Sequence, residues 1–403
     1  MSDRAMLTVD EALVRLLAGI RQTDGERLAL GHALGRVPSA DAMSADVDLP
    51  PFPNSAMDGF AVLAEDGDGS RRVIGESRAG GPPAPAVRAG TAVRIMTGAP
   101  LPAGADTVVP IEEAEESDGA VMLHSTPSVG RHVREAGLDV RRGSSVPLPR
   151  LPLTPSAIGL LAALGTSELD VRRRPRVAVL STGDELRDVG SPLGHGQIYD
   201  ANAPALAAAV TEAGGVALVL ERAPDEPSVI EARIRSAVEA ADLLVLSGGV
   251  SVGAHDHVRT VIERLGTLDF WRIAVQPGKP LAFGRIGEMP VVGLPGNPVS
   301  ALVTFEVFVR PMLRAMLGLA GDGRLRVAAE VTEVIAKDED RRAYLRVVVT
   351  RGAEGYRASS AGGQGSSQLL PLASANALLV VPEGVPATEP GASYEAMLLG
   401  GIA

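Results

Sequence analysis

The sequence contains no cysteine, and this absence excludes several kinds of chemistry. Without thiols there are no disulfides, no iron–sulfur clusters, no thiolate zinc sites and no cysteine nucleophile. The absence fits a reducing compartment. Aromatic residues are also scarce, at 3% of the chain. The hydrophobic cores must therefore be built mainly from Ala, Val, Leu and Ile.

Long apolar runs and an excess of positive charge are missing as well. No segment reaches the roughly 18 apolar residues that a membrane-spanning helix needs. The stretch from Met1 to Ile20 lacks the basic start, apolar core and cleavage site of a signal peptide. The chain carries 38 basic and 49 acidic residues, whereas a nucleic-acid-binding protein needs a basic face. We therefore expect a cytoplasmic protein that binds neither membranes nor nucleic acids.

The length of 403 residues predicts several domains, and the pattern of apolar and turn residues changes twice in the first part of the chain. Residues 51–141 carry short apolar runs separated by Gly and Pro, which is typical of a β-rich module. The flanking pieces, 1–50 and 142–175, contain helix signals: a capping box at Thr8 and a Thr-Pro start at Thr154. These patterns predict a β module inserted into a discontinuous helical domain.

Residues 176–322 alternate strand and helix signals, which predicts a parallel, doubly wound sheet. One of the helices is expected to begin at Ser228 with a capping box to Glu231. The predicted strands are Val177–Leu180, Val216–Leu220, Leu243–Leu246 and Pro290–Leu294. After these residues the helical period vanishes, and 323–403 reads as a small, barrel-like β domain.

Three glycine-containing loops follow predicted strands of the α/β domain: 181–185, 247–253 and 294–298. Glycine lets the backbone approach a ligand, and free N–H groups in such loops can hold an anion. Any one loop is as readily an ordinary tight turn, but three at equivalent strand ends favour a shared ligand site. The candidate ligand-binding residues in these loops are Ser181, Thr182, Gly183, Ser247, Gly248, Gly249, Ser251, Gly253, Pro295, Gly296, Asn297 and Pro298.

Charged residues lie in or near the same loops. Glu185, Asp225 and Asp256 are carboxylates, and carboxylates that converge on a phosphate site usually do so through a hard cation such as Mg²⁺. We take Glu185 and Asp256 as candidate metal ligands, although each acid alone is more simply a helix cap or a solvated charge. Lys279 lies between Pro277 and Pro280, which restrict the backbone and fix where the lysine points. A fixed ammonium group is a natural anion ligand, although a surface lysine in a turn explains the pattern equally well.

Two other catalytic patterns are disfavoured. Residues 249–253 match the G-x-S-x-G elbow of α/β-hydrolases, but Ser247 and Gly248 separate the motif from its strand. A hydrolase of this type also needs a later histidine, and none follows His257. The six histidines form no zinc-binding pattern.

Taken together, several segments resemble the molybdopterin molybdenumtransferase family, which includes the E domain of gephyrin. They occur in the family's order along nearly the whole chain. The matching stretches are residues 53–62 (PNSAMDGFAV), 94–99 (RIMTGA), 104–109 (GADTVV), 181–186 (STGDEL), 247–253 (SGGVSVG) and 293–300 (GLPGNPVS).

The resemblance implies an elongated homodimer whose α/β domain binds the pterin. It implies that the inserted β module of the partner subunit closes over the same cleft. The implied reaction inserts molybdenum from molybdate into adenylylated molybdopterin and releases AMP, with Mg²⁺ as cofactor. A molybdopterin adenylyltransferase and downstream molybdoenzymes are the implied partners.

Residue by residue, the resemblance implies a cleft lined by Asp58, Thr97, Glu185, Asp225 and Asp256. Lys279 would contact the molybdate or the phosphate, and the C-terminal motifs would add Arg341, Arg346 and Ser366. There are two departures. Some members of the family carry a lysine at the position of Gln276, and their arginine motif often begins Gly-Arg where this chain has Asp340-Arg341.

Two other functions stay open from the sequence. The first is a gephyrin-like scaffold that binds peptides with little catalysis, against which the retained Asp58, Glu185, Asp256 and Lys279 argue. The second is a hydrolase that cleaves a nucleotide-like pyrophosphate, which the inserted module and the C-terminal β domain make less fitting. The sequence does not separate molybdate from tungstate, because both are tetrahedral dianions of similar size.

Overall fold

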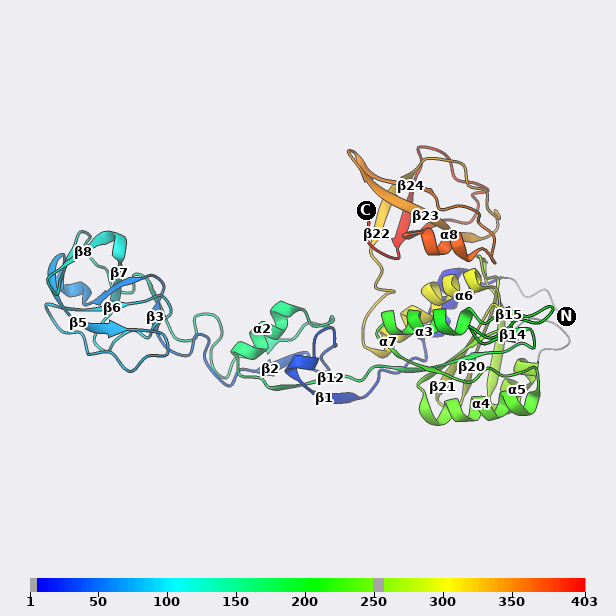
Figure 1. Ribbon diagram of the computed structural model, residues 1–403, viewed down its shortest axis with the longest axis horizontal. Helices are drawn as coiled ribbons and strands as arrows, with labels where there is room; N and C mark the ends of the chain where they lie inside the picture. Colours follow the sequence, from blue (N-terminus) through cyan, green and yellow to red (C-terminus); the bar gives the residue numbers. More distant parts are fainter. Residues whose placement is uncertain (1–5, 249–256, 403) are drawn as a thin grey trace. The chain divides into compact units, whose positions relative to one another are not determined.

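The computed structural model describes residues 6–248 and 257–402. The chain forms two compact units, coloured along the sequence in Figure 1. The main unit consists of Met1–Asp24 and Arg172–Ala403, and the inserted unit is Gly25–Val171. Among the described residues no helix is long and apolar enough to cross a membrane.

The first helix, α1 (Val9–Leu17), begins at the predicted capping box. Glu11 N donates to Thr8 Oγ1 at 3.2 Å, and Thr8 N donates to Glu11 Oε2 at 2.8 Å. The buried face of α1, including Leu16, packs in the hydrophobic core of the α/β domain. This corrects the expected boundary, which joined residues 1–24 to residues 25–50 in one domain. The helix signal was right, but a local pattern does not say which core an apolar face enters.

The inserted unit contains the predicted β-rich module. Its six-stranded sheet has the order β7-β4-β6-β5-β9-β8. The strands are β4 (Gly59–Val62), β5 (Gly69–Ser77), β6 (Thr91–Ile95), β7 (Thr107–Pro110), β8 (Ala114–Ser117) and β9 (Ala120–Leu123), with the short pair β3 (Asn54–Ser55) and β10 (Val133–Arg134) beside them. Two 3₁₀ turns, η2 (Ala64–Asp66) and η3 (Ile111–Glu113), connect strands of the sheet. Because the sheet buries Phe60, Val62, Val109 and Val121 against one another, the module has a core of its own.

The remaining part of the inserted unit is discontinuous in sequence, as expected. Its elements are β1 (Gly25–Ala29) paired with β12 (Glu168–Arg172), β2 (Ala42–Ser44) paired with β11 (Ser145–Pro147), the 3₁₀ turn η1 (Leu30–His32) and α2 (Pro155–Ala163). Within residues 25–50 and 142–171, all of which are described, α2 is the one α-helix. Thr154 caps it, and Leu161 packs on Leu153, Leu169 and Val171.

The α/β domain is built on a six-stranded sheet of order β16-β13-β17-β21-β20-β18. The first four strands are parallel and match the predicted runs: β16 (Val216–Val219), β13 (Arg176–Ser181), β17 (Leu243–Ser247) and β21 (Met289–Leu294). The last two, β20 (Pro280–Ile286) and β18 (Thr267–Arg272), are antiparallel and were not predicted. The short parallel pair β14 (Leu186–Arg187) and β15 (Ile198–Tyr199) follows β13.

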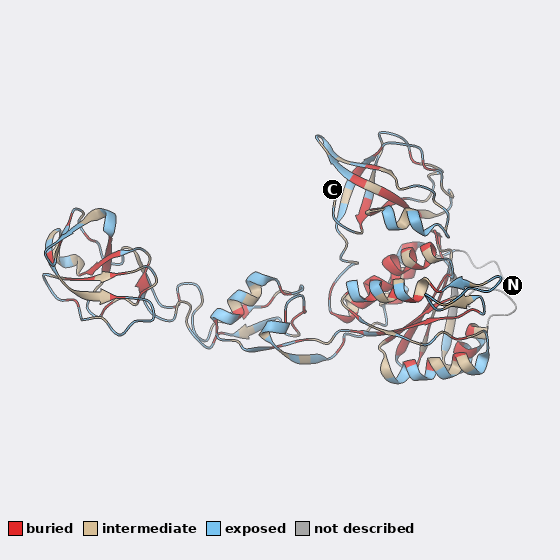
Figure 2. Cartoon of the chain, viewed as in Figure 1, coloured by how far each residue is buried: buried red, intermediate tan, exposed pale blue. Residues whose placement is uncertain are grey.

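Helices cover both faces of this sheet, which confirms the doubly wound prediction. One core contains α1, α3 (Asn202–Glu212), α6 (Pro298–Thr304), the π-helical turn η4 (Phe305–Val309) and α7 (Arg310–Met316); the other contains α4 (Pro227–Ala240) and α5 (His257–Leu265). The central strands β13, β17 and β21 are almost wholly buried, whereas the edge strand β16 is partly exposed. Figure 2 shows much of α6 as buried and the outer sides of α3 and α4 as exposed. The predicted capping box at Ser228 is wrong, because Pro227 starts the helix and the Ser228 hydroxyl instead donates to Glu226.

The C-terminal domain is a small closed barrel, as expected. Its strands are β22 (Arg326–Val331), β23 (Arg342–Gly352), β24 (Gly355–Ser360), β25 (Ala377–Val381) and β26 (Ser393–Leu398), with α8 (Leu369–Ser374) before β25. Pairing of β23 with β25 closes the ring. A short strand from the α/β domain, β19 (Val275–Gln276), pairs with β23 and ties the barrel to that domain.

Candidate active site

The three predicted loops converge at one end of the α/β sheet because their strands end in register. Ser181 of β13 lies opposite Ser247 of β17, and Ser247 lies opposite Leu294 of β21. Parallel strands that end level deliver the loops after them to the same edge, where doubly wound sheets bind ligands. A pocket of about 700 Å³ opens at this edge.

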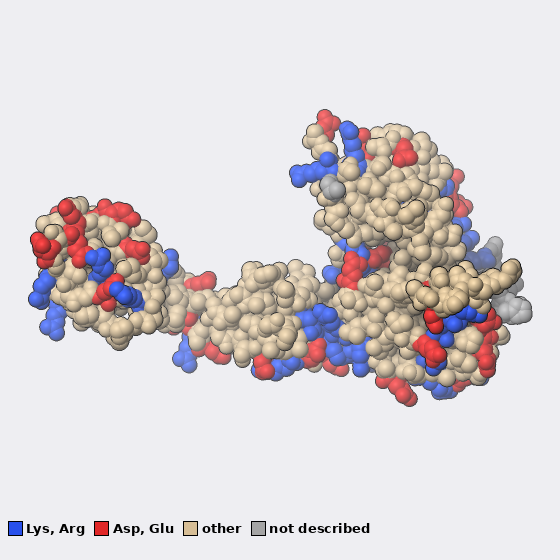
Figure 3. All heavy atoms as spheres, viewed as in Figure 1, with Lys and Arg blue, Asp and Glu red and all other residues tan. Residues whose placement is uncertain are grey.

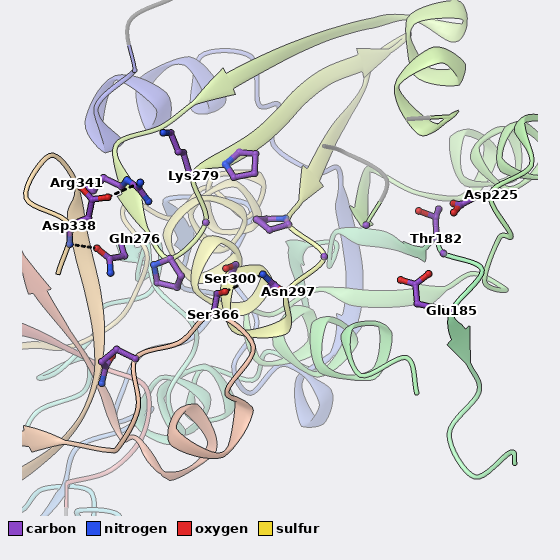
Figure 4. A pocket seen from close by; sticks show the side chains of 18 of the residues that line it. Thr182, Glu185, Asp225, Gln276, Lys279, Asn297, Ser300, Asp338, Arg341 and Ser366 are labelled. Atoms are coloured by element: carbon purple, nitrogen blue, oxygen red, sulfur yellow. Dashed lines mark hydrogen bonds and ion pairs between the residues drawn. The ribbon is translucent and has the colours of Figure 1, made fainter. Parts of the chain in front are cut away.

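The pocket draws on both domains of the main unit, as Figure 4 shows. The α/β domain contributes Thr182, Gly183, Glu185, Asp225, Gly248, His257, residues 276–280, Pro295, Gly296, Asn297 and Ser300, and the barrel contributes Asp338, Arg341, Gln364 and Ser366. The predicted Thr182, Gly183, Glu185, Asp225, Gly248, Lys279, Pro295, Gly296, Asn297, Arg341 and Ser366 are therefore together in one cavity.

Glycine is required where the first two loops touch. Gly248 has φ +87°, and a Cβ atom there would lie 2.7 Å from Thr182 O. Any larger residue would combine backbone strain with a clash against main chain. Asn202, which was not predicted, joins the second and third loops: its Nδ2 donates to Ser247 Oγ at 2.7 Å and to Gly296 O at 2.8 Å.

One end of the pocket is acidic. In Figure 4 Glu185 and Asp225 lie together at one end, near Thr182. Burial, together with the nearby carboxylates of Asp184 and Glu185, raises the pKa of Asp225. Thr182 Oγ1 is buried and has no hydrogen-bond partner among the described residues. Crowded carboxylates beside an unused hydroxyl form a set of oxygen donors suited to a hard cation.

The other end holds cations. Lys279 and Arg341 lie there in Figure 4, and Arg341 Nη2 pairs with Asp338 Oδ2 at 2.7 Å. Gly278, just before the lysine, has φ +110° and packs so closely on Thr304 that a Cβ would be 2.4 Å from its methyl carbon. The loop that carries Lys279 is therefore held tightly against α6.

Ser366 joins the barrel to the helix that starts at the pocket. Asn297 Nδ2 donates to Ser366 Oγ at 3.1 Å, and Val299 N donates to Ser366 O at 3.2 Å. The N-terminus of α6 is thus capped from the barrel, because Asn297 makes no side-chain cap of its own. Gln364, which was not predicted, lines the pocket next to Ser366.

Arg346 does not line the pocket but supports the barrel loop that carries Gln364 and Ser366. It is 1% exposed and donates from Nη2 to the carbonyls of Gly363 and Gly365, at 3.0 and 3.2 Å. Burial lowers the pKa of its guanidinium. The expectation that Arg346 binds substrate directly is corrected here: its side chain turns into the barrel, where loop carbonyls bind it.

Other predicted residues lie elsewhere. Ser181 and Ser247 are buried behind the loops, and Pro298 forms the first turn of α6. The predicted Gly249, Ser251, Gly253 and Asp256 lie outside the described residues. Within the part of the chain that is described, no group of three acidic or histidine side chains is arranged to hold a metal.

Asp58 and Thr97 belong to the inserted unit and contact each other. Asp58 Oδ1 accepts hydrogen bonds from Thr97 N at 2.6 Å and from Thr97 Oγ1 at 2.8 Å. These bonds, the backbone one first, lower the pKa of Asp58. The pair is therefore an ionised carboxylate held in a fixed orientation, while its predicted place in the substrate cleft stays a prediction.

The fold and the pocket define an α/β ligand-binding domain with a fused β-barrel and a large insertion, and comparisons with known proteins agree. Three family models match in order: "MoeA N-terminal region (domain I and II)" at residues 7–165, "Probable molybdopterin binding domain" at 178–315 and "MoeA C-terminal region (domain IV)" at 328–399. The crystal structure of a molybdopterin biosynthesis MoeA protein from Pyrococcus horikoshii is similar to 98% of this chain and 100% of that one, with a TM-score of 0.85 and 33% identity.

Named relatives are similar along most of their length. Molybdopterin molybdenumtransferase 2 of Mycobacterium tuberculosis is 40% identical over 88% of this chain and 90% of its own. The molybdopterin molybdenumtransferase of Haemophilus influenzae is 41% identical over 78% of each chain. The chain belongs to the molybdopterin molybdenumtransferase family.

Proposed function

We propose that the protein is a transferase of molybdenum cofactor biosynthesis that inserts molybdenum from molybdate into adenylylated molybdopterin and releases AMP. Family membership supports the transferase role. The observation that carries the finer proposal is the pocket itself, which has carboxylates at one end and fixed cations at the other. A molybdopterin adenylyltransferase would supply this substrate, and molybdoenzymes would receive the product.

The chemistry needs charge compensation before anything else. Molybdate is a dianion, and the adenylylated pterin carries a phosphoanhydride, so the two repel each other in water. Lys279 and Arg341 at one end of the pocket would hold the oxyanion through charge-assisted hydrogen bonds. Loop N–H groups near Gly183 and Gly248 would hold the phosphates.

The acidic end fits Mg²⁺, and we propose that the ion binds there. Glu185 and Asp225 are the described carboxylates of the pocket, and Asp256 is a further predicted ligand. Two carboxylates suffice, because Mg²⁺ usually keeps several waters and takes its other ligands from substrate phosphates. Burial first, and then the negative charges of Asp184 and Glu185, raise the pKa of Asp225, and a cation bound beside these carboxylates would offset their mutual repulsion. Bound there, Mg²⁺ would neutralise charge on the phosphoanhydride.

The side chains then act mainly by position. Lys279, Arg341, Ser366 and the glycine loops hold two anions in one cavity, so their encounter becomes effectively intramolecular. An oxygen of water or molybdate would attack the phosphoanhydride as its bond breaks, and stabilising the negative charge on the departing AMP supplies the rest. The sequence has no cysteine, and the reaction requires no covalent nucleophile from the protein.

The test is reconstitution with purified protein, adenylylated molybdopterin, molybdate and Mg²⁺. We expect stoichiometric AMP and a product that activates a molybdenum-free apoenzyme. The same gene should restore molybdoenzyme activity in a deletion strain. Tight pterin binding without AMP release would instead support the scaffold alternative and reject the proposal.

A further inference from the structure

Gln276 reaches from the pocket to the C-terminal barrel. It is the last residue of β19, which pairs with Arg342 and Ala343 of β23. Its side-chain Oε1 accepts a hydrogen bond from Asp338 N at 2.7 Å, drawn in Figure 4. The same side chain lines the pocket. One residue therefore lines the cavity and holds the part of the barrel that faces it.

The segment that Gln276 contacts is held together by bonds among its own residues. Lys337 Nζ donates to Asp338 O at 2.8 Å and to Arg341 O at 2.6 Å. Arg341 N donates to Asp338 O at 3.3 Å, and the Arg341 guanidinium pairs with the Asp338 carboxylate. Because these contacts join Asp338 to Arg341, a bond that fixes Asp338 also fixes the Arg341 guanidinium.

The bond demands an acceptor at position 276. A backbone N–H only donates, so the amide of Gln276 must present its oxygen. Glutamate could replace it as an acceptor, whereas lysine carries three donors and no acceptor, and methionine sulfur accepts only weakly. Gln276 provides the acceptor without placing a charge beside Lys279.

We infer that Gln276 is a positioning residue that acts through Asp338 to hold Arg341 at the same end of the pocket as Lys279. Two cations from different domains then meet one oxyanion. The identity of that oxyanion as molybdate rests on the proposed function, but the hydrogen bond and its effect on Arg341 do not.

The first experiment measures the bond directly. Hydrogen exchange at the Asp338 amide is compared in the full-length protein and three variants. Gln276→Met and Gln276→Lys remove the acceptor, and we expect Asp338 to exchange roughly fivefold faster, as for loss of one ordinary hydrogen bond. Gln276→Glu is the matched control, which keeps an acceptor and should keep the protection. Unchanged exchange in Gln276→Met would overturn the inference.

The second experiment asks whether Gln276 acts through Arg341. Binding of inorganic molybdate is titrated by calorimetry in four proteins: the parent, Gln276→Met, Arg341→Ala and the double variant. A positioning residue predicts roughly fivefold weaker binding in Gln276→Met and no further loss in the Arg341→Ala background. Equal losses in both backgrounds would show direct contact with the ligand and would overturn the inference.

The glutamate and lysine variants separate position from charge. Gln276→Glu should bind molybdate weakly while Asp338 stays protected, because a negative charge now lies beside Lys279. Gln276→Lys should not bind molybdate more tightly than the parent despite its added charge, and tighter binding would count against the inference. If the parent itself binds no molybdate, the proposed function fails, and the exchange result alone decides the role of Gln276.

Discussion

At the scale of single residues, the two cations of the pocket differ in how far their charge is already compensated. Arg341 pairs with Asp338, and Gln276 fixes that pair. Lys279 makes no ion pair with any residue in the described part of the chain. Because an uncompensated ammonium gains most from an incoming anion, Lys279 should contribute more to oxyanion binding than Arg341 does.

We predict that Lys279→Ala weakens the use of molybdate about ten- to a hundredfold, the range of one charge-assisted hydrogen bond. Lys279→Arg should recover only part of the loss, because a planar guanidinium directs its donors differently. Initial rates are measured against molybdate at saturating pterin, with the exposed Arg150→Ala as control. An unchanged molybdate dependence with lost pterin binding would assign the lysine to the phosphate.

Two aspartates should show opposite dependence on pH. The pKa of Asp225 is raised, so the folded chain holds its proton more readily than the unfolded chain does. Its contribution to stability is then lost as pH rises from the ordinary aspartate range through the raised pKa. At Asp242 burial raises the pKa, but hydrogen bonds from Arg173 and Arg176 outweigh it and the net pKa is lowered. Its contribution is present above the ordinary pKa and is lost as pH falls through the lowered value.

At neutral pH and in the absence of metal, Asp225→Asn should therefore raise the midpoint of thermal unfolding. The same variant should abolish any stabilisation of the protein by Mg²⁺. Asp242→Asn should lower the midpoint, because it weakens a pair in which both oxygens accept from Arg173 at 2.8 Å. Thermal melts between pH 4 and 8, with and without Mg²⁺, test both variants. We expect the midpoint to shift by on the order of one degree or more. A lower midpoint for Asp225→Asn would show that the carboxylates at this end of the pocket do not destabilise the fold by repelling each other.

At the scale of elements, buried strands were the most predictable part. The runs in β13, β17 and β21 are apolar throughout because both faces of the sheet are covered by helices. β20 was missed because it starts beside the Pro-Gly-Lys-Pro turn and its pairing with β18 is fixed only in three dimensions. The glycine loops after these strands predicted one end of the pocket, because parallel strands that end in register bring the loops after them to the same edge of the sheet.

On the barrel side of the site, motifs predicted Arg341 and Ser366 but not Asp338 or Gln364. Asp338 and Gln364 reach the pocket because β19 pairs with β23, two strands far apart in sequence. Arg346 fell in a recognised motif, yet its side chain turns inward to bind loop carbonyls. A motif identifies which residue matters, whereas packing decides whether that residue touches the ligand or supports one that does.

The capping box of α1 gives a test at this scale. Thr8→Ala should lower the free energy of unfolding by about 1 kcal/mol, because Glu11 N loses the side-chain acceptor that caps the N-terminus of the helix. Denaturant melts measure the change. Val14→Ala, at a site on the same helix that is 69% exposed, is the control and should change stability far less. Equal losses in the two variants would mean that the cap contributes nothing specific.

At the scale of the whole molecule, acidic residues outnumber basic ones, 49 to 38. On the side shown in Figure 3, Lys and Arg lie among Asp and Glu and do not form a broad basic surface. The formal net charge is −11. The anionic substrates of the proposed reaction therefore depend on local cations inside the pocket, such as Lys279 and Arg341, and not on long-range attraction by the protein.

The last prediction concerns the proposed homodimer. Light scattering should give about twice the chain mass of 41.5 kDa. The resemblance implies that Asp58 of one subunit serves the pocket of the other, where Lys279 lies. At limiting molybdate, Asp58→Ala and Lys279→Ala should each lose most of the activity, but their mixture should regain activity after subunit exchange. Random pairing gives about half mixed dimers with one intact site each, hence about a quarter of the parent rate.

If Asp58 and Lys279 serve one site within a single chain, no mixed dimer has an intact site and the mixture stays inactive. A fully active monomer would likewise reject the shared site.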